Sequence, residues 1–222
     1  MKKCHLYAAT VALLLTGATS QGRYGPGGLA ERRPHQTTVR NDAIKAELEK
    51  MLEQDQELRR RADEVEEKHG SKSKELEELW EKQREIDKKN LARLEEIIKV
   101  NGWPRKSVVG STASLAAFLI LQHADYEYQK KYFPLVNEAL NEGEIEPNRV
   151  ALLEDRILIR EGKEQIYGTQ LKRNESSGKY ELSPIKDEEN LDKRRAAVGL
   201  SPIAEYLKTF GLEYAPPKKK QR

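Results

Sequence analysis

The sequence has a single cysteine, and the usual signatures of covalent catalysis are missing as well. Cys4 lies at the start of the 222-residue chain, so the rest of the protein has no disulfide, no thiolate nucleophile and no cysteine metal site. Neither the Gly-x-Ser-x-Gly turn of serine hydrolases nor the His-Glu-x-x-His spacing of zinc peptidases occurs. These absences leave no visible activated nucleophile and weigh against a zinc site.

Long apolar runs are also scarce. The run Leu6–Leu15 follows Lys2 and Lys3 and precedes the small residues Ala18-Thr19-Ser20, which is the order of a signal peptide. It is much shorter than the ~20 residues that span a bilayer. The pattern therefore predicts a signal peptide over residues 1–20, export to the periplasm or the medium, and no membrane span after cleavage.

The excess of one charge over the other is small too, because 40 Lys and Arg nearly balance 37 Asp and Glu, for a net charge of +3. The basic excess lies at the ends, and basic ends are more typical of solvated tails than of nucleic-acid-binding arms. We therefore expect no nucleic-acid partner. The composition predicts a flexible leader over 21–40, one mostly helical domain over 41–211 and a basic tail over 212–222.

Between Asn41 and Val100 the apolar residues recur three and four positions apart, which predicts two amphipathic helices. Gly70 suits the end of the first helix and Ser73 the start of the second, so the pair should form an antiparallel hairpin. Polar residues interrupt both apolar stripes, namely Asp55, Gln83, Asp87 and Asn90. Burying an unpaired carboxylate costs several kcal/mol. We interpret the interruptions as one wall of a polar pocket; the alternative is that they only fix the register.

The segment Leu115–Gln129 is the best candidate for a central buried helix, because its first half is apolar and uncharged. Its polar second half begins at Gln122-His123-Ala124-Asp125. On one continuous helix, Gln122, Asp125 and Gln129 would share the inward face with Leu115 and Phe118, and His123 would flank it. We expect the next helix to begin at Phe133-Pro134.

The only clear β signal follows a short helix that begins at Pro147 and ends near Leu153. Runs rich in apolar residues on either side of Glu161-Gly162 predict a tight hairpin over residues 155–170. One face of this hairpin would carry Arg156, Gln165 and Tyr167, and Lys179–Leu182 would add a third strand. The predicted fold class is mostly α: a helical hairpin plus a central buried helix, with a small antiparallel β-hairpin or three-stranded sheet.

An ordered set of short motifs resembles a bacterial family known only as a domain of unknown function. The resemblance spans roughly residues 42–207 and implies no established activity. The motifs are Asp55-Gln56 with Arg59, Asp87 with Asn90, Gly102-Trp103-Pro104, Gln122-His123-Ala124-Asp125, Asp155-Arg156, Tyr167-Gly168-Thr169-Gln170 and Arg195-Ala196-Ala197-Val198-Gly199-Leu200.

The motifs and the polar interruptions fall on the same residues, which predicts one polar site. The first hypothesis is hydrolysis or transfer on a small anionic substrate. His123 would be the general acid or base, since histidine titrates near neutrality. Asp125 or Asp155 would orient it, and Arg156 or Arg195 would stabilise an anion. The expected ligand-binding residues are Asp55, Gln56, Asp87, Asn90, Gln122, Gln129, Arg156, Gln165, Tyr167, Gln170 and Arg195.

Three alternatives stay open at this point. A metal centre at His123 with Asp125, Asp55 or Asp87 has weak support, so we expect no metal, and no cofactor is indicated. A non-catalytic module could bind a small polar ligand or a peptide with the same residues. Finally, the polar groups could satisfy one another as a structural core. The sequence does not predict an oligomeric state.

Overall fold

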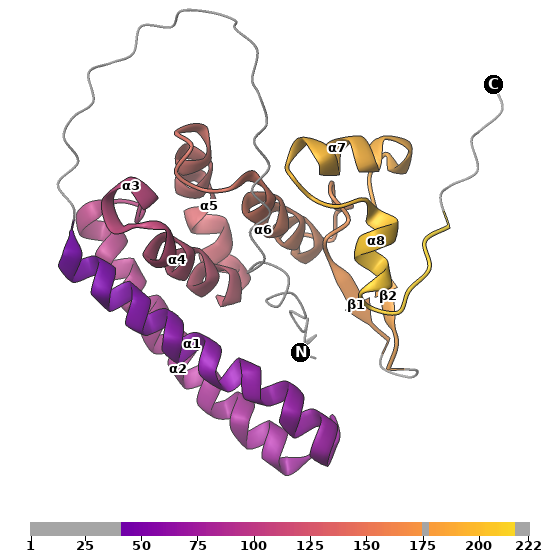
Figure 1. Ribbon diagram of the computed structural model, residues 1–222, viewed down its shortest axis with the longest axis horizontal. Helices are drawn as coiled ribbons and strands as arrows, with labels where there is room; N and C mark the ends of the chain where they lie inside the picture. Colours follow the sequence, from indigo (N-terminus) through magenta and orange to yellow (C-terminus); the bar gives the residue numbers. More distant parts are fainter. Residues whose placement is uncertain (1–40, 175–177, 216–222) are drawn as a thin grey trace, which may run out of the picture.

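The two long N-terminal helices form the predicted antiparallel hairpin. The computed structural model describes residues 41–174 and 178–215, with α1 at Asp42–His69 and α2 at Lys74–Asn101 (Figure 1). The side chain of Asn41 accepts a hydrogen bond from the Ile44 amide at 3.1 Å, and Ser73 Oγ accepts one from the Leu76 amide at 3.2 Å. Gly70 and Gly102 end the two helices. The hairpin prediction is confirmed, while the predicted signal peptide over 1–20 and leader over 21–40 lie outside the described residues.

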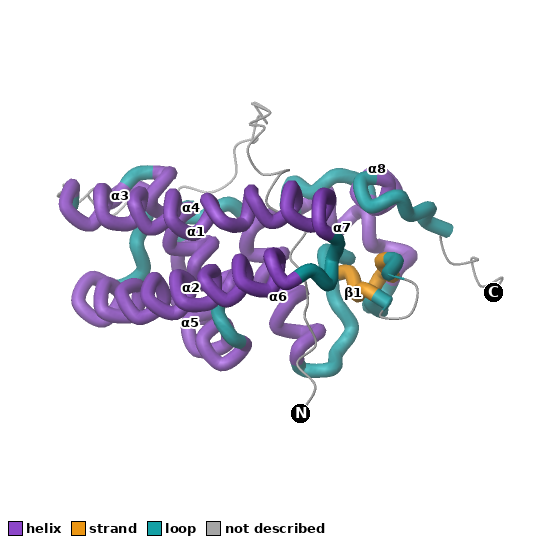
Figure 2. Tube along the Cα trace, turned by 90° about the horizontal axis from the view of Figure 1, so that it is seen from below, coloured by secondary structure: helices purple, strands orange, loops and turns teal. Residues whose placement is uncertain are grey.

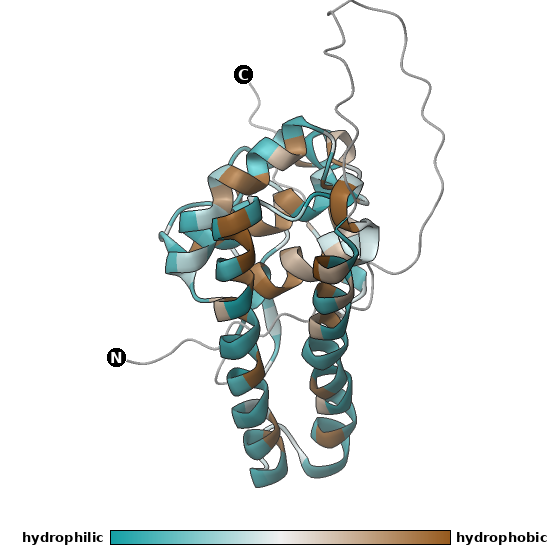
Figure 3. Ribbon diagram, turned by 90° about the vertical axis from the view of Figure 1, so that its left-hand side faces the viewer, coloured by the Kyte–Doolittle hydropathy of each residue, from teal (hydrophilic) through white to brown (hydrophobic). Residues whose placement is uncertain are grey.

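Helix α4, Ser111–His123, is the centre of the main core. It follows the short helix α3, Lys106–Val109, and packs against α1, α2 and α5. Every residue from Ala116 to Gln122 is buried. Figure 3 shows that the far half of the α1–α2 hairpin projects beyond this core and is mainly hydrophilic. The buried helix therefore meets the middle of the hairpin, where the polar interruptions lie.

The prediction that the central helix continues to Gln129 is wrong. Helix α4 ends at His123, Ala124 is extended, and a new helix α5 runs from Tyr126 to Asn141 with Pro134 inside it. Gln129 stabilises the break, because its Nε2 donates to the carbonyls of Gln122 and Ala124 at 2.8 and 3.0 Å. Since Pro134 is exposed, water can bind the carbonyl that its missing N–H leaves free.

The predicted β-hairpin over 155–170 is also wrong, because residues Pro147–Arg160 form a single helix, α6, which packs against α5. The Glu161-Gly162 pair that resembled a hairpin turn is a helix end. Gly162 has φ 72°, its amide donates to Ile159, and the Lys163 amide donates to Leu158 at 2.9 Å. This is the Schellman arrangement. A glycine with positive φ serves both structures, so the local sequence did not distinguish them.

The strands lie further along, in a C-terminal lobe formed by residues 165–174 and 178–215. Strands β1, Leu171–Arg173, and β2, Tyr180–Leu182, pair antiparallel with Leu171 opposite Leu182. The 3-10 helix η1 and helices α7 and α8 follow at Glu188–Asn190, Leu191–Ala197 and Ile203–Lys208. They enclose a small core of Ile185, Leu191, Ile203 and Leu207. Figure 2 shows the strands toward the same end of the molecule as α7 and α8.

The predicted fold class is confirmed: a mostly α protein with a small antiparallel β-hairpin. The strand expected at Lys179–Leu182 exists, but its partner is β1 and not the segment 155–170. Among the helices of residues 41–174 and 178–215, none combines the length and apolar character needed to cross a membrane.

Candidate functional site

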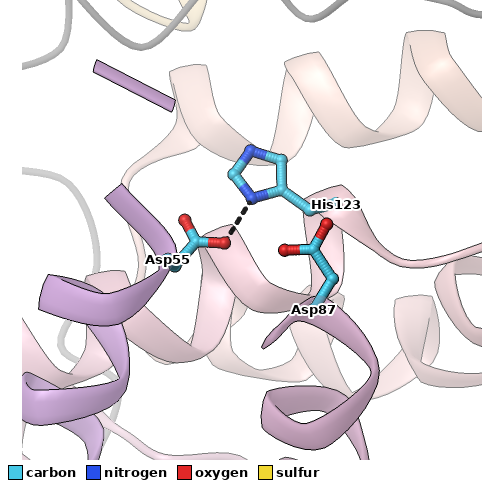
Figure 4. Close-up of side chains that lie close together, drawn as sticks. All are labelled: Asp55, Asp87 and His123. Atoms are coloured by element: carbon cyan, nitrogen blue, oxygen red, sulfur yellow. Dashed lines mark hydrogen bonds and ion pairs between the residues drawn. The ribbon is translucent and has the colours of Figure 1, made fainter. Parts of the chain in front are cut away.

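A buried histidine–aspartate pair lies where α4 meets the middle of the hairpin (Figure 4). His123 is the last residue of α4, and its Nδ1 lies 3.0 Å from Oδ1 of Asp55 on α1. The two side chains are 3% and 1% exposed. An ionised carboxylate accepts hydrogen bonds only, so Nδ1 carries the proton and Nε2 has a free lone pair. Within the described residues, the buried Nε2 has no hydrogen-bond partner.

Arg59 joins this pair to the second helix of the hairpin. One turn after Asp55, its Nη2 lies 3.3 Å from Asp55 Oδ1 and 2.6 Å from Asp87 Oδ1. Gln83 Nε2 donates to the same Asp87 oxygen at 2.7 Å, and Gln56 donates to the other Asp55 oxygen. Because Arg59 and Gln56 bond the two oxygens of the Asp55 carboxylate, its orientation toward His123 is fixed.

The pKa shifts of the two partners favour an ionised aspartate and a neutral histidine. Burial alone would raise the pKa of Asp55, but the hydrogen bond and charge of His123, together with Arg59 and Gln56, lower it to about 2. Burial lowers the pKa of His123 below its ordinary value, although Asp55 opposes this effect. Near neutral pH, His123 Nε2 is therefore an unprotonated base beside a fixed negative charge.

The same residues offer ligands for a cation, but an arginine already lies among them. Donor atoms of Asp55, Asp87 and His123 lie within 4.8 Å of one another. The guanidinium of Arg59 bridges the two carboxylates and compensates their charge. A metal ion would have to displace Arg59 from both aspartates. This arrangement supports an acid–base site more directly than a metal centre, so our expectation of no metal stays a prediction.

Gln122, Arg156 and Gln129 lie beside the histidine at the end of α4. Arg156, buried on α6, donates from Nη1 to the Gln122 carbonyl at 3.2 Å, and Gln129 donates to the same carbonyl. Gln122 Oε1 and Arg156 Nε are buried and have no partner in the described part of the chain. Asn90 serves the hairpin instead, because its Nδ2 donates to the Met51 carbonyl at 3.3 Å.

Asp125 lies apart from the site. It is exposed on the turn before α5, and its carboxylate makes no capping hydrogen bond. The break between α4 and α5 is the reason, because it turns Asp125 away from the inward stripe on which we had placed it. Asp55, which comes from a different helix, holds the imidazole in its place.

The remaining predicted site residues form a second cluster around the loop 165–170. Asp155 on α6 accepts hydrogen bonds from the amides of Ile166, Tyr167 and Thr169 at 2.6 to 3.2 Å, and from Thr169 Oγ1 at 2.9 Å. All of these hydrogen bonds to the Asp155 carboxylate come from the loop, so Asp155 does not orient His123.

Two more predicted residues, Gln165 and Arg195, hold the same loop from inside. Gln165 Nε2 donates to the carbonyls of Gln170 and Ser183, and its Oε1 accepts from the Gln170 amide. Arg195 donates to the carbonyls of Tyr167 and Ser201, each at 2.6 Å, and its guanidinium lies over the Tyr206 ring. This second cluster is a closed set of hydrogen bonds that ties the C-terminal lobe to α6.

The expected ligand-binding residues did not include Arg59 or Gln83, although Arg59 was part of the motif set and Gln83 of the expected pocket wall, and both bond the carboxylates at the centre of the site. The signal for each was the spacing of four positions to a partner on the same helix face, Asp55 to Arg59 and Gln83 to Asp87. A solvent-exposed helix carries many such pairs, so the spacing by itself was not specific.

The fold and the site define a mostly α protein with a buried His–Asp pair at the junction of a helical hairpin and a central helix. The chain belongs to a family of unknown function, DUF6624, whose model matches residues 42–218. No curated protein and no solved structure gives a significant match.

Proposed function

We propose that the protein catalyses hydrolysis or group transfer on a small anionic substrate, with His123 as the general base. The observation that carries this proposal is the His123 imidazole, whose Nδ1 is held by buried Asp55 while Nε2 is left without a partner. A neutral histidine oriented by a carboxylate through one nitrogen and free at the other is the arrangement that proton transfer requires.

The base would act on a water molecule or on a hydroxyl of the acceptor, since no protein hydroxyl from the described residues bonds His123 Nε2. In hydrolysis, Nε2 takes a proton from water while the water oxygen forms a bond to the acyl or phosphoryl centre. The bond to the leaving group then breaks, and Nε2–H returns the proton to it. Asp55 stabilises the imidazolium between these steps, as a carboxylate partner does in other acid–base pairs.

The arrangement of Arg59 and Asp87 supports the same proposal from a second side. Arg59 bonds both carboxylates and shares Asp55 Oδ1 with His123, so Asp55 stays ionised while it holds the imidazole. A polar core with only a structural role would be expected to pair its buried atoms with one another, because each unpaired polar atom is unfavourable. His123 Nε2 departs from that expectation.

The test is turnover of two anionic esters, p-nitrophenyl phosphate and mono-p-nitrophenyl succinate, by purified wild type and by His123→Gln. We expect His123→Gln to lower kcat/KM by about 10²–10⁴-fold at an unchanged fold, because proton transfer contributes that much. Asp55→Asn should give a similar but smaller loss, and His69→Gln, at the exposed end of α1, should leave turnover unchanged.

Other outcomes would favour the alternatives. Absence of turnover in the wild type, with a small polar ligand that still stabilises it, would make the protein a binding module. A lowered unfolding temperature of His123→Gln with no activity and no ligand in any variant would make the cluster structural.

We also propose that the protein is exported through the N-terminal signal peptide expected over residues 1–20. The support is the order of Lys2 and Lys3, the apolar run Leu6–Leu15 and Ala18-Thr19-Ser20. Expression of the full chain in a bacterium should give a product that begins near Gln21 and lies outside the cytoplasm. Mass spectrometry of cell fractions measures both, and an intact N-terminus in the cytoplasm would refute the proposal.

A further inference from the structure

Arg156 on α6 is a buried guanidinium with no anionic partner. The residue is 6% exposed. Its Nη1 donates to the Gln122 carbonyl at 3.2 Å, while its buried Nε donates to nothing in residues 41–174 and 178–215. No ion pair of those residues includes Arg156. A neutral carbonyl is thus the only group that this charge contacts by a hydrogen bond within the described chain.

Two other arginines of this region, half-buried Arg59 and buried Arg195, make more interactions than Arg156 does. Arg59 bridges two carboxylates, and Arg195 bonds two carbonyls and stacks on the ring of Tyr206. The partner set of Arg156 is therefore incomplete in a region where the other guanidinium groups are satisfied. An unpaired buried charge is strongly unfavourable, so a negatively charged partner is expected.

The free edge of Arg156 has the geometry for an oxyanion. The bond to Gln122 uses Nη1 and leaves Nε and Nη2. These two nitrogens point their N–H groups in parallel along one edge of the planar guanidinium, which matches the two oxygens of a carboxylate or phosphate. Lysine has no such fork, so the geometry is specific to arginine.

The charges nearby leave the positive charge of Arg156 uncompensated. Asp55 and Asp87 form ion pairs with Arg59, and Asp155 accepts hydrogen bonds from the loop 165–170. Burial, with smaller contributions from Arg160 and Arg59, lowers the pKa of Arg156 to about 10, so it remains charged at neutral pH. One singly charged anion would neutralise it.

We propose that the Nε–Nη2 edge of Arg156 binds the oxyanion group, a carboxylate or a phosphate, of the substrate on which His123 acts. That the anion belongs to a substrate rests on the proposed function, but the presence of an anion site at Arg156 does not. Arg156 is anchored on the carbonyl of Gln122, the residue next to His123. The anion site and the imidazole therefore belong to the same end of α4.

Binding can be measured without knowing the substrate. The full chain is titrated with inorganic phosphate and, separately, with succinate, at ionic strength held constant with sodium chloride, by calorimetry and by the unfolding temperature. We expect at least one of the two anions to bind the wild type and to stabilise it. Arg156→Gln should weaken that binding by about tenfold to a hundredfold, as for loss of a charge-assisted pair of hydrogen bonds.

Two further variants make the comparison specific. Arg149→Gln removes an arginine from the same helix, one that is paired with Glu146 at 2.7 Å, and should leave binding unchanged. Arg156→Lys keeps the charge but loses the fork, so it should fall between wild type and Arg156→Gln. Arg156→Gln is expected to fold, because Gln129 still donates to the Gln122 carbonyl at 2.8 Å. If Arg156→Gln does not fold, the comparison of wild type with Arg156→Lys tests the proposal, and weaker anion binding by Arg156→Lys is the expected result.

Each outcome bears on the proposal. Arg156-dependent binding of phosphate alone identifies a phosphorylated substrate, and of succinate alone a carboxylated one. No binding of either anion by the wild type, or equal binding by wild type and Arg156→Gln, overturns the proposal. His123→Gln should bind the anion as the wild type does, so a failure of the catalytic role and a failure of the anion site give different results.

Discussion

Asp55 and Asp155 are both buried aspartates, yet the structure uses them in opposite ways. Asp155 accepts hydrogen bonds chiefly from backbone amides of one loop, and Asp55 accepts them from the side chains of Gln56, Arg59 and His123. Backbone amides neither titrate nor change partners easily, whereas arginine and histidine carry or exchange charge. The first arrangement fixes a loop, and the second prepares a proton acceptor.

The two environments also shift the pKa values in opposite directions. Burial raises the pKa of Asp155 even though the amides of Tyr167, Thr169 and Ile166 favour its charged form. The pKa of Asp55 falls to about 2, because its charged and hydrogen-bonding neighbours outweigh burial. Buried carboxylates are therefore not interchangeable indicators of a site, and the chemistry of the partners decides what each one does.

The largest expected effect is the loss of stability in Asp155→Ala. Removing the carboxylate leaves the buried amides around the loop 165–170 without an acceptor, which should cost about 3–5 kcal/mol of unfolding free energy. Chemical denaturation followed by circular dichroism measures this, with Asp125→Ala as the exposed control. A loss below about 1 kcal/mol would mean that the loop is not held by Asp155.

A smaller loss is expected from Gly168→Ala in the same loop. Gly168 has φ +68°, and an added Cβ would lie 3.1 Å from the Cδ1 atoms of both Ile185 and Ile203. Backbone strain and crowding together should cost about 1–3 kcal/mol. The control is Gly178→Ala, which has the same φ and no atom within 4 Å of the new Cβ. Equal losses in the two variants would show that packing against the C-terminal lobe contributes nothing.

The smallest effect is a pH dependence that depends on His123. Because the folded pKa of His123 is lowered, the unfolded chain binds this proton more tightly, and stability should fall as pH drops below the unfolded value near 6.5. Asp55, with a pKa of about 2, adds a loss of the same sign below pH 4. Asp155 has the opposite sign, because its pKa is raised.

Unfolding temperatures of wild type and His123→Gln, measured between pH 8 and pH 5, isolate the contribution of His123 to the pH dependence of stability. The wild-type curve should descend more steeply with acidification than that of the variant. Parallel curves would contradict a lowered pKa for His123.

The errors in the predicted fold share one physical cause. Glu161-Gly162 is the end of a helix and not a hairpin turn, because a glycine with positive φ suits both, and the choice depends on what the flanking residues pack against. The break after His123 is equally non-local, since Gln129 closes it from the next helix. Periodicity and capping residues together predicted the hairpin α1–α2, because both helices are long and carry clear caps.

The sequence by itself determined which residues are unusual: charged and amide side chains at inward positions of helices, and one histidine at the end of an apolar run. Those features are local, because helix period and burial follow from the order of apolar residues. Only the tertiary structure decided the pairing. His123 bonds Asp55, 68 residues away in the sequence, and not Asp125. Asp155 bonds loop residues 11 to 14 positions further along the chain. Tertiary packing brings these partners together, and no local sequence pattern specifies it.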